Sequence, residues 1–302
     1  QLPTRNIQSI ASTSAGVFQE DEGSEISIKG SRSSSTEYYI DGIRVRGSTN
    51  LPANAIEQLT VITGGVPARY GDATGGIINI VTKGPSRELN GGVEFITSQF
   101  LDGFGYNLAN FNLTGPIYIK NKGTDSAQAK IGFFIAGEFG YQKDPDPSAV
   151  GVWQVKDDKL TDLQNNPLVR SPVGDAFISA TQTVTFDDLE KSKIKPNTSR
   201  YNYSLSSKLD FKITDKIGIT VGGSVNYSRY NDYVARYSLF NAENNPLNKE
   251  LSWRVFARYT QRFGKSYTDP NETSKSPFQN AYYSLQFDYS KVYNTFEDES
   301  HG

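Results

Sequence analysis

Residues 37–83, EYYIDGIRVRGSTNLPANAIEQLTVITGGVPARYGDATGGIINIVTK, combine short β-forming runs with glycine-rich turns. The run Tyr38–Val45 predicts a strand with a turn at Asp41-Gly42, and residues 76–82 predict a further strand. Between them, residues 53–59 can form a short helical turn. The N-terminal part of the chain is therefore expected to be a small α+β unit.

The rest of the chain alternates apolar and polar residues with a period of two, which is typical of strands with two different faces. Seven segments carry this pattern: 91–98, 106–118, 130–141, 200–213, 217–230, 250–263 and 280–293. Several run 12–14 residues, beyond the usual five or six of globular sheets and enough to span a bilayer when tilted. Only 36% of the residues are hydrophobic, which a barrel with a polar lumen allows.

Charge decides which face of these strands meets lipid. Arg254, Arg258 and Arg262 lie on one face of segment 250–263, and each would cost roughly 2–4 kcal/mol near the midplane of a bilayer. The apolar face is therefore predicted to meet lipid, and the arginines to line the lumen or contact the N-terminal unit. The tight turn at 214–216 predicts the periplasmic side, and the long loop after residue 142 predicts the outside. This orientation gathers an aromatic girdle near the outer interface: Tyr141, Tyr201, Tyr203, Tyr227, Trp253, Tyr289 and Tyr293.

Four ordered motifs in the N-terminal unit resemble the plug domain of TonB-dependent outer-membrane receptors. They are Tyr39-Ile40-Asp41-Gly42, Ala55-Ile56-Glu57-Gln58, Ala68-Arg69-Tyr70-Gly71 and residues 76–83 (GIINIVTK). The resemblance implies a plug over residues 1–89 inside an antiparallel transmembrane β-barrel, of which this family has about 22 strands. Residues 90–302 would be the first part of that barrel, with a long extracellular loop at 143–199. Seven strands cannot close such a barrel, so the chain is expected to be part of a longer protein.

The same resemblance implies active uptake of a scarce nutrient across the outer membrane of a Gram-negative bacterium. The implied partners are a TonB-type energising complex, which would pull on a segment upstream of Gln1, and the nutrient cargo. Further implied partners are outer-membrane lipid, lipopolysaccharide, and a surface lipoprotein or another outer-membrane subunit. The cargo's identity, whether siderophore, vitamin, glycan or peptide, is left open by the sequence. Two other functions stay open as well: a structural or docking subunit of an outer-membrane complex, and a secreted soluble β-sheet binding protein.

The resemblance also assigns roles to individual residues. Plug folding and contact with the wall are expected of Asp41, Glu57, Arg69 and Tyr70, together with the lumenal Arg254, Arg258 and Arg262. Cargo contact is expected of two outward plug loops, with Glu20 and Asp21 in the first and Arg46, Ser48, Thr49 and Asn50 in the second. The acidic residues at 20–22 also fit a solvated loop, and residues 46–54 also fit a plain surface turn.

The composition gives no support to several other functions. The chain has no Cys and a formal net charge of −2, which gives no support to thiolate metal sites or a nucleic-acid partner. Its one histidine, His301, lies almost at the end of the sequence, so an interior Ser-His-Asp arrangement is excluded and no enzyme activity or cofactor is expected. Asp144, Asp146 and the pair Asp157-Asp158 are interpreted as solvated loop acids rather than a cation site.

The long loop is expected to contain two elements. Residues 151–155 predict a small strand, and Thr185–Asp188 predicts a capping box that opens a short helix through Lys193. A loop of this length is often functional. A cargo gate, a partner surface and a neutral insertion all remain open for it.

Overall fold

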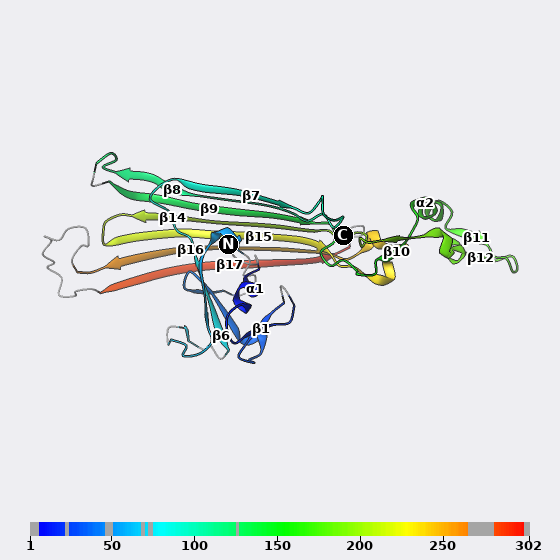
Figure 1. Cartoon of the computed structure of the whole chain (residues 1–302), viewed down its shortest axis with the longest axis horizontal. Helices are drawn as coiled ribbons and strands as arrows, with labels where there is room; N and C mark the ends of the chain where they lie inside the picture. Colours follow the sequence, from blue (N-terminus) through cyan, green and yellow to red (C-terminus); the bar gives the residue numbers. More distant parts are fainter. Residues whose placement is uncertain are drawn as a thin grey trace.

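The computed structural model describes residues 6–21, 24–45, 51–67, 70–71, 75–124, 127–264 and 281–298. Its largest element is an antiparallel sheet of seven strands, called the wall below, in the order β17-β16-β15-β14-β9-β8-β7 (Figure 1). The wall strands are β7 (Asn90–Thr97), β8 (Asn107–Lys120), β9 (Gln128–Gln142), β14 (Arg200–Lys212), β15 (Ile217–Asn231), β16 (Leu247–Arg262) and β17 (Tyr282–Glu297). All seven predicted segments are confirmed as strands, and their order in the sheet follows the chain.

The two faces of the wall differ as the alternation predicts. Paired rows such as Leu205, Val225 and Trp253 form an apolar outer face, on which many large side chains are exposed. The neighbouring row, with Ser206, Ser224 and Arg254, belongs to the inner face, which packs against the N-terminal unit. Strands of 13 to 16 residues from β14 to β17 therefore carry one continuous apolar surface.

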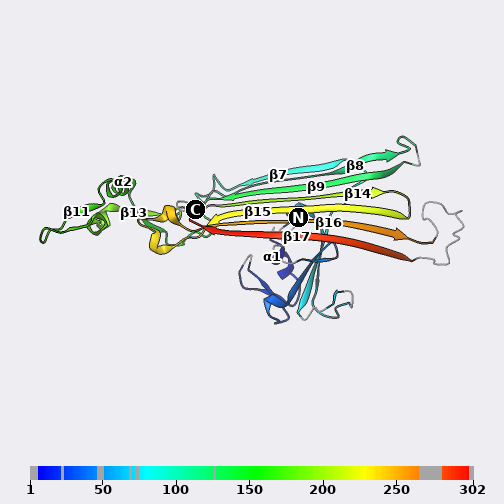
Figure 2. The same ribbon diagram turned by 180° about the vertical axis from the view of Figure 1, so that it is seen from behind.

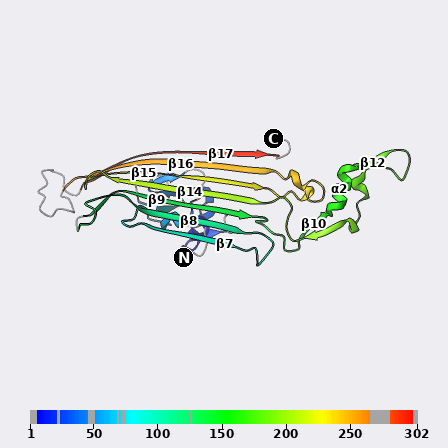
Figure 3. The same cartoon turned by 90° about the horizontal axis from the view of Figure 1, so that it is seen from above.

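The N-terminal unit (residues 6–83) packs on the inner face of the wall near the middle of its strands (Figures 1 and 3). It contains a four-stranded sheet in the order β4-β3-β6-β5, a two-stranded sheet β1-β2, and helix α1. The elements are α1 (Ile7–Ser12), β1 (Val17–Gln19), β2 (Ile26–Ile28), β3 (Thr36–Ile40), β4 (Ile43–Val45), β5 (Ile56–Ile62) and β6 (Gly76–Thr82). Isoleucines from α1, β2, β3 and β6 fill its core.

One expectation for this unit is wrong in extent. The helical turn predicted for residues 53–59 is a single 3₁₀ turn at Ala53–Ala55, and Ile56 already begins β5. Pairing with β6 decides the outcome, because it satisfies the backbone of residues 58–62 in a sheet. The predicted strands at Tyr38–Val45 and 76–82 are present as the β3–β4 hairpin and β6.

The long loop between β9 and β14 holds a small folded body, called the outer-loop module (residues 152–192). It consists of β10 (Val152–Val155), α2 (Asp157–Asn165), β11 (Leu168–Arg170), β12 (Phe177–Ser179) and β13 (Leu189–Ser192), and it projects beyond the end of the wall (Figure 2). Val155, Leu163 and Ala180 form its core, against which Leu239 of the next outer loop packs.

The module corrects two further expectations. The capping box of Thr185 and Asp188 is present, but it opens one 3₁₀ turn, Phe186–Asp188, followed by β13 instead of a helix. Hydrogen bonds donated by the Thr185 backbone and hydroxyl lower the pKa of the Asp188 carboxyl. Asp157 and Asp158, which were expected in a loop, lie in the first turn of α2, where carboxylates stabilise a helix.

In the described part of the chain, no helix has both the length and the apolar character needed to cross a membrane.

Candidate functional site

The tip of the β3–β4 hairpin is the point where the N-terminal unit meets the wall. Asp41 and Gly42 have φ values of 53° and 83°, which fits the type I′ turn that Asp-Gly favours in two-residue hairpins. The Asp41 carboxylate turns back onto the end of β6, where it accepts hydrogen bonds from the Thr82 backbone N–H at 3.1 Å and from the Thr82 hydroxyl at 2.7 Å. One side chain thus joins the hairpin to the end of the central strand.

Three cationic side chains of the wall converge on this tip. Lys208 of β14 donates to Asp41 Oδ1 at 3.3 Å and to the carbonyl oxygen of Thr82 at 3.1 Å. Arg254 of β16 donates to the carbonyl oxygen of Ile40 at 3.1 Å, and Arg258 donates to the carbonyl oxygen of Asp41. The wall therefore holds both the carboxylate and the backbone of the turn.

The two arginines are themselves positioned by the neighbouring strand. Arg254 Nε donates to Asp288 Oδ2 of β17 at 2.6 Å, and Arg258 Nε donates to Gln286 Oε1 at 3.1 Å. The side chains of Asp41 and Lys208 are only 6% and 11% exposed, so this ion pair is largely shielded from water. Shielded charges need partners, because an unpaired buried charge is costly.

A second contact between the two parts lies at the 3₁₀ turn before β5. Asn54 Nδ2 donates to Asn110 Oδ1 at 3.1 Å and to the carbonyl oxygen of Phe111 at 2.9 Å. Beside it, Ala55 packs against Phe134 and Ala136 of β9. The N-terminal unit is therefore attached to β8 and β9 as well as to β14 and β16.

Of the other residues expected at the plug–wall contact, those that the structure describes lie elsewhere. Glu57 is exposed at a β-bulge of β5, and Tyr70 packs edge-on against Tyr39 inside the N-terminal unit, with ring centroids 4.8 Å apart. Arg262, the last residue of β16, lines a hollow at the β14–β15 turn. Arg69 lies outside the described residues.

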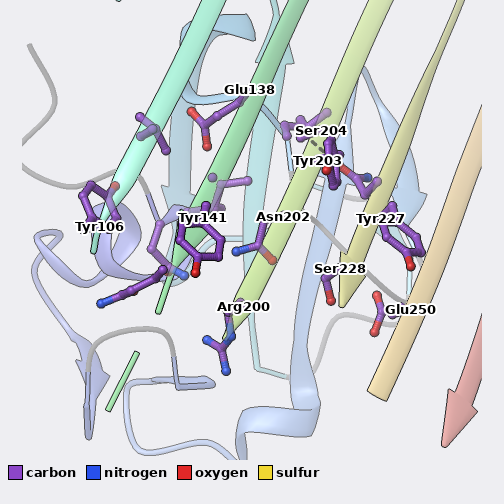
Figure 4. A pocket seen from close by; sticks show the side chains of 17 residues that line it. Tyr106, Glu138, Tyr141, Arg200, Asn202, Tyr203, Ser204, Tyr227, Ser228 and Glu250 are labelled. Carbon is purple, nitrogen blue, oxygen red and sulfur yellow. Dashed lines mark hydrogen bonds between the residues drawn. The ribbon is translucent and has the colours of Figure 1, made fainter. Parts of the chain in front are cut away.

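A cavity of about 350 Å³ opens on the inner face, between the N-terminal unit and the outer-loop end of the wall (Figure 4). Asn6, Ile7 and Leu51 close it from the N-terminal unit. Its wall side carries Glu138, Arg200, Asn202, Ser204, Asn226, Ser228 and Glu250, which come from four neighbouring strands.

Strand register explains why these polar groups meet. Glu138, Ser204 and Asn226 are direct neighbours across β9, β14 and β15, and the Ser204 hydroxyl donates to Asn226 Oδ1 at 2.8 Å. One row further out, Asn202, Ser228 and Glu250 are aligned in the same way. The cavity thus offers hydroxyl, amide and carboxylate groups, with the guanidinium of Arg200 stacked 4.9 Å from the ring of Tyr230. Such a lining suits a polar solute that exchanges hydrogen bonds with it.

The predicted cargo loops relate to this cavity in different ways. Arg46, Ser48, Thr49 and Asn50 lie outside the described residues, but Leu51, which follows them directly, lines the cavity. Glu20 and Asp21 lie in the exposed turn between β1 and β2, where the Ser24 hydroxyl accepts from the Asp21 backbone N–H. Neither of these two acids lines the cavity. The cavity's wall side chains were not predicted from the sequence, although each is a polar residue on the inner phase of its strand.

The N-terminal part of the chain is similar to a known protein family. A family model described as the TonB-dependent Receptor Plug Domain matches residues 1–77. The matched segment contains the Asp41 turn and ends within β6.

Two curated relatives and one solved structure extend the similarity into the wall. The chain is 35% identical over 154 residues to the probable TonB-dependent siderophore receptor PirA of Acinetobacter baumannii, covering 45% of the chain and 20% of that protein. It is 26% identical over 256 residues to the ferric enterobactin receptor PirA of Pseudomonas aeruginosa, covering 72% of the chain and 33% of that protein. The crystal structure of the siderophore receptor PirA from Pseudomonas aeruginosa superposes with a TM-score of 0.55 at 18% identity, over 97% of the chain and 39% of that structure. The chain therefore spans a third or less of these curated relatives.

Proposed function

The chain belongs to the TonB-dependent outer-membrane receptors, of which it contains the plug and part of the β-barrel, and on this premise we propose that it takes up a scarce nutrient. The proposed boundaries are residues 1–89 for the plug and 90–302 for the barrel part, with the extracellular loop at 143–199. Energy for uptake would come from a TonB-type complex, since relatives are named as TonB-dependent.

One observation carries this proposal: the plug is fixed to the inner face of the wall while a polar cavity stays open beside it on the outer-loop side. A solute arriving from outside would meet Glu138, Asn202 and Glu250 before it met the plug core. A path inward requires that the plug move or rearrange, and apart from the packing of Ala55 on β9 its described attachment to the wall is polar. Polar contacts can exchange for water without exposing a hydrophobic core, so they suit a plug that must be remodelled.

Cargo contact is proposed for the cavity lining and for the loop that leads into it, with Arg46, Ser48, Thr49 and Asn50. Leu51 supports this assignment, because it connects that loop to the cavity. A ferric siderophore is the first cargo to test, since both curated relatives are named as receptors of this kind. Transport would require no chemical change of the cargo, so we propose no enzymatic role.

The test is growth of the native organism under iron limitation. A deletion strain is expected to lose growth on the siderophore that the receptor takes up, and to regain it with the full-length gene. Inactivating the TonB-type complex should abolish growth on the same siderophore in the complemented strain. Uptake that persists without the complex would contradict the proposal.

A docking role remains a second candidate, and the outer-loop module favours it. The module has its own core and is joined at its base by Asn245, which is fully buried and donates to the carbonyl oxygens of Pro196 and Asn197 at 3.1 Å each. A fixed body of this kind suits a surface lipoprotein or another outer-membrane subunit. Deleting residues 152–192 should then release the partner on purification while siderophore uptake persists.

A further inference from the structure

Three outer loops of the wall, which follow β7, β9 and β15, are joined to one another by hydrogen bonds of buried side chains. They span residues 98–106, 143–199 and 232–246. The first two continue directly into residues that line the cavity: Tyr106 is the last residue of the first loop, and Gln142 and Arg200 flank the second. The placement of these loops therefore sets the shape of the cavity mouth.

Asp144 connects the two ends of the long loop and ties them to the loop after β7. Its side chain is fully buried, and Oδ2 accepts from the Lys195 backbone N–H at 2.7 Å while Oδ1 accepts from the Asp146 backbone N–H at 3.2 Å. The backbone N–H groups of Lys143 and Asp144 donate to the carbonyl oxygen of Phe104 at 2.9 and 3.3 Å. A carboxylate accepts with both side-chain oxygens, whereas the amide of an asparagine has a single acceptor oxygen, so an acid suits this position.

Asn245 continues the connection into the loop between β15 and β16. It is fully buried, and its Nδ2 donates to the carbonyl oxygens of Pro196 and Asn197 at 3.1 Å each. Its Oδ1 accepts from the Val234 backbone N–H at 3.2 Å, so the amide is satisfied on both sides. Asn197 returns the contact, because its own Nδ2 donates to the carbonyl oxygen of Glu243 at 3.0 Å. The three loops are thus linked in series through Asp144 and Asn245.

Burial makes these links costly to break. A buried donor or acceptor that loses its partner carries the full desolvation penalty of that group, and the penalty is larger for a charged group. Movement of one loop away from the others would leave the Asp144 carboxylate or the Asn245 amide without partners. The exposed ion pair between Arg170 and Asp175 in the outer-loop module has no such penalty, since both side chains stay in water when it opens.

We propose that Asp144 and Asn245 are positioning residues for cargo: they hold the three outer loops as one collar, so that the cavity mouth is formed before the cargo arrives. Neither residue lines the cavity, and both act through Gln142 and Arg200, which do. A preformed mouth lowers the ordering cost of binding and so raises affinity. This role rests on the proposed function of nutrient uptake, and it assigns part of the cargo affinity to residues outside the cavity.

The collar can be tested on the full-length receptor with three variants. Asp144→Ala removes both acceptor oxygens, Asp144→Asn keeps one, and Asn245→Ala removes the link to the third loop. Asp175→Asn is the matched control for the acid, because the Asp175 side chain is 93% exposed although it pairs with Arg170 at 2.6 Å. Asn166→Ala is the control for the amide, since Asn166 donates to Asp162 at an exposed position.

Two measurements separate a positioning role from a general loss of stability. Hydrogen exchange in segments 193–199 and 232–246 of the purified receptor reports whether the collar holds. KM and Vmax for uptake of the ferric siderophore on which the complemented strain grows report cargo affinity and turnover separately. Resistance of the barrel to heat in detergent gel electrophoresis verifies that each variant is folded.

Asp144→Ala and Asn245→Ala are each expected to speed exchange in both segments and to raise KM by about tenfold, with Vmax unchanged because the contact of Lys208 with Asp41 is untouched. Asp144→Asn should lie between Asp144→Ala and the wild type, and both controls should match the wild type. Unchanged KM in the two alanine variants would overturn the inference, and so would a fall in Vmax alone. Faster exchange in the variants of a receptor whose wild type takes up no siderophore would refute the proposed function itself.

Discussion

Lys208 of the wall and Asp41 of the plug are 167 positions apart in the chain, yet the lysine ammonium lies 3.3 Å from the aspartate carboxylate. Both side chains are nearly buried. The same carboxylate accepts two hydrogen bonds from Thr82, so one contact couples the hairpin tip, the end of β6 and strand β14. Attachment of the plug to the wall is concentrated at this point and at Asn54.

Replacing Lys208 by Met should loosen the plug without unfolding the barrel. Removal of one partner from a buried ion pair costs about 3–5 kcal/mol, because the remaining charge is left uncompensated. Hydrogen exchange of the β3–β4 hairpin in the purified receptor would measure the loss as faster exchange. Lys130→Met is the matched control: its ion pair with Asp215 spans 3.4 Å but is more exposed, so it should change stability by only about 0–1 kcal/mol. Equal effects of both substitutions would contradict this account.

Substitutions at Asp41 should distinguish the contribution of the turn conformation to plug stability from the contribution of the carboxylate charge. Asp41→Asn keeps a side chain that tolerates positive φ, and its one carbonyl oxygen can still accept from the Thr82 backbone N–H. Its amide nitrogen cannot accept from the Thr82 hydroxyl, and the charge pairing with Lys208 is lost. Asp41→Ala loses every one of these interactions and adds backbone strain of about 1–2 kcal/mol. Thermal unfolding of the plug should therefore rank wild type above Asn, and Asn above Ala. An Ala variant as stable as the Asn variant would show that the turn geometry carries no cost.

Filling the cavity should block uptake. Ser204 faces the cavity from β14, and a Trp in its place would occupy much of the 350 Å³ and displace the bond to Asn226. Uptake of radiolabelled ferric siderophore is expected to fall by about tenfold or more, which corresponds to about 1.4 kcal/mol of binding free energy. Ser207→Trp serves as the control, because Ser207 lies on the opposite face of the same strand. Unimpaired uptake by the Ser204→Trp variant would place the cargo path elsewhere.

The plug should lose stability in strong alkali through Tyr38. Burial, and secondarily the Glu25 carboxylate, raise the pKa of Tyr38 from 10.0 to about 12. The neutral phenol is thus favoured in the fold, so its contribution to stability is complete below pH 10 and is lost as the pH rises toward 12. The difference in tyrosinate absorbance between the wild type and Tyr38→Phe would report this titration. A midpoint near 10 for Tyr38 would contradict the expected burial effect.

Much of the architecture follows from local sequence. Asp41-Gly42 specifies a two-residue hairpin, and the alternation around Leu205, Leu209 and Phe211 specifies a strand with two faces. These features depend on backbone preference and on solvent partition of single side chains, so a sequence displays them directly. Short elements were harder to predict, as α2 illustrates: its acidic first turn and the Leu160–Leu163 spacing were the available signals.

The site depended on contacts that no local pattern contains. Arg254, Arg258 and Arg262 share one phase of β16, but the first two reach the plug turn, while Arg262 is the last residue of the strand and lies beside the β14–β15 turn. In the sequence, Lys208 is one of several polar residues on the inner phase of its strand, and only the fold shows that it lies beside Asp41. The sequence by itself determined the strands, their two faces and the resemblance to a plug, because these reside in neighbouring residues. Only the tertiary structure decided which cations hold the plug and which polar rows enclose the cavity, because docking joins residues more than a hundred positions apart and sheet register aligns side chains from separate strands.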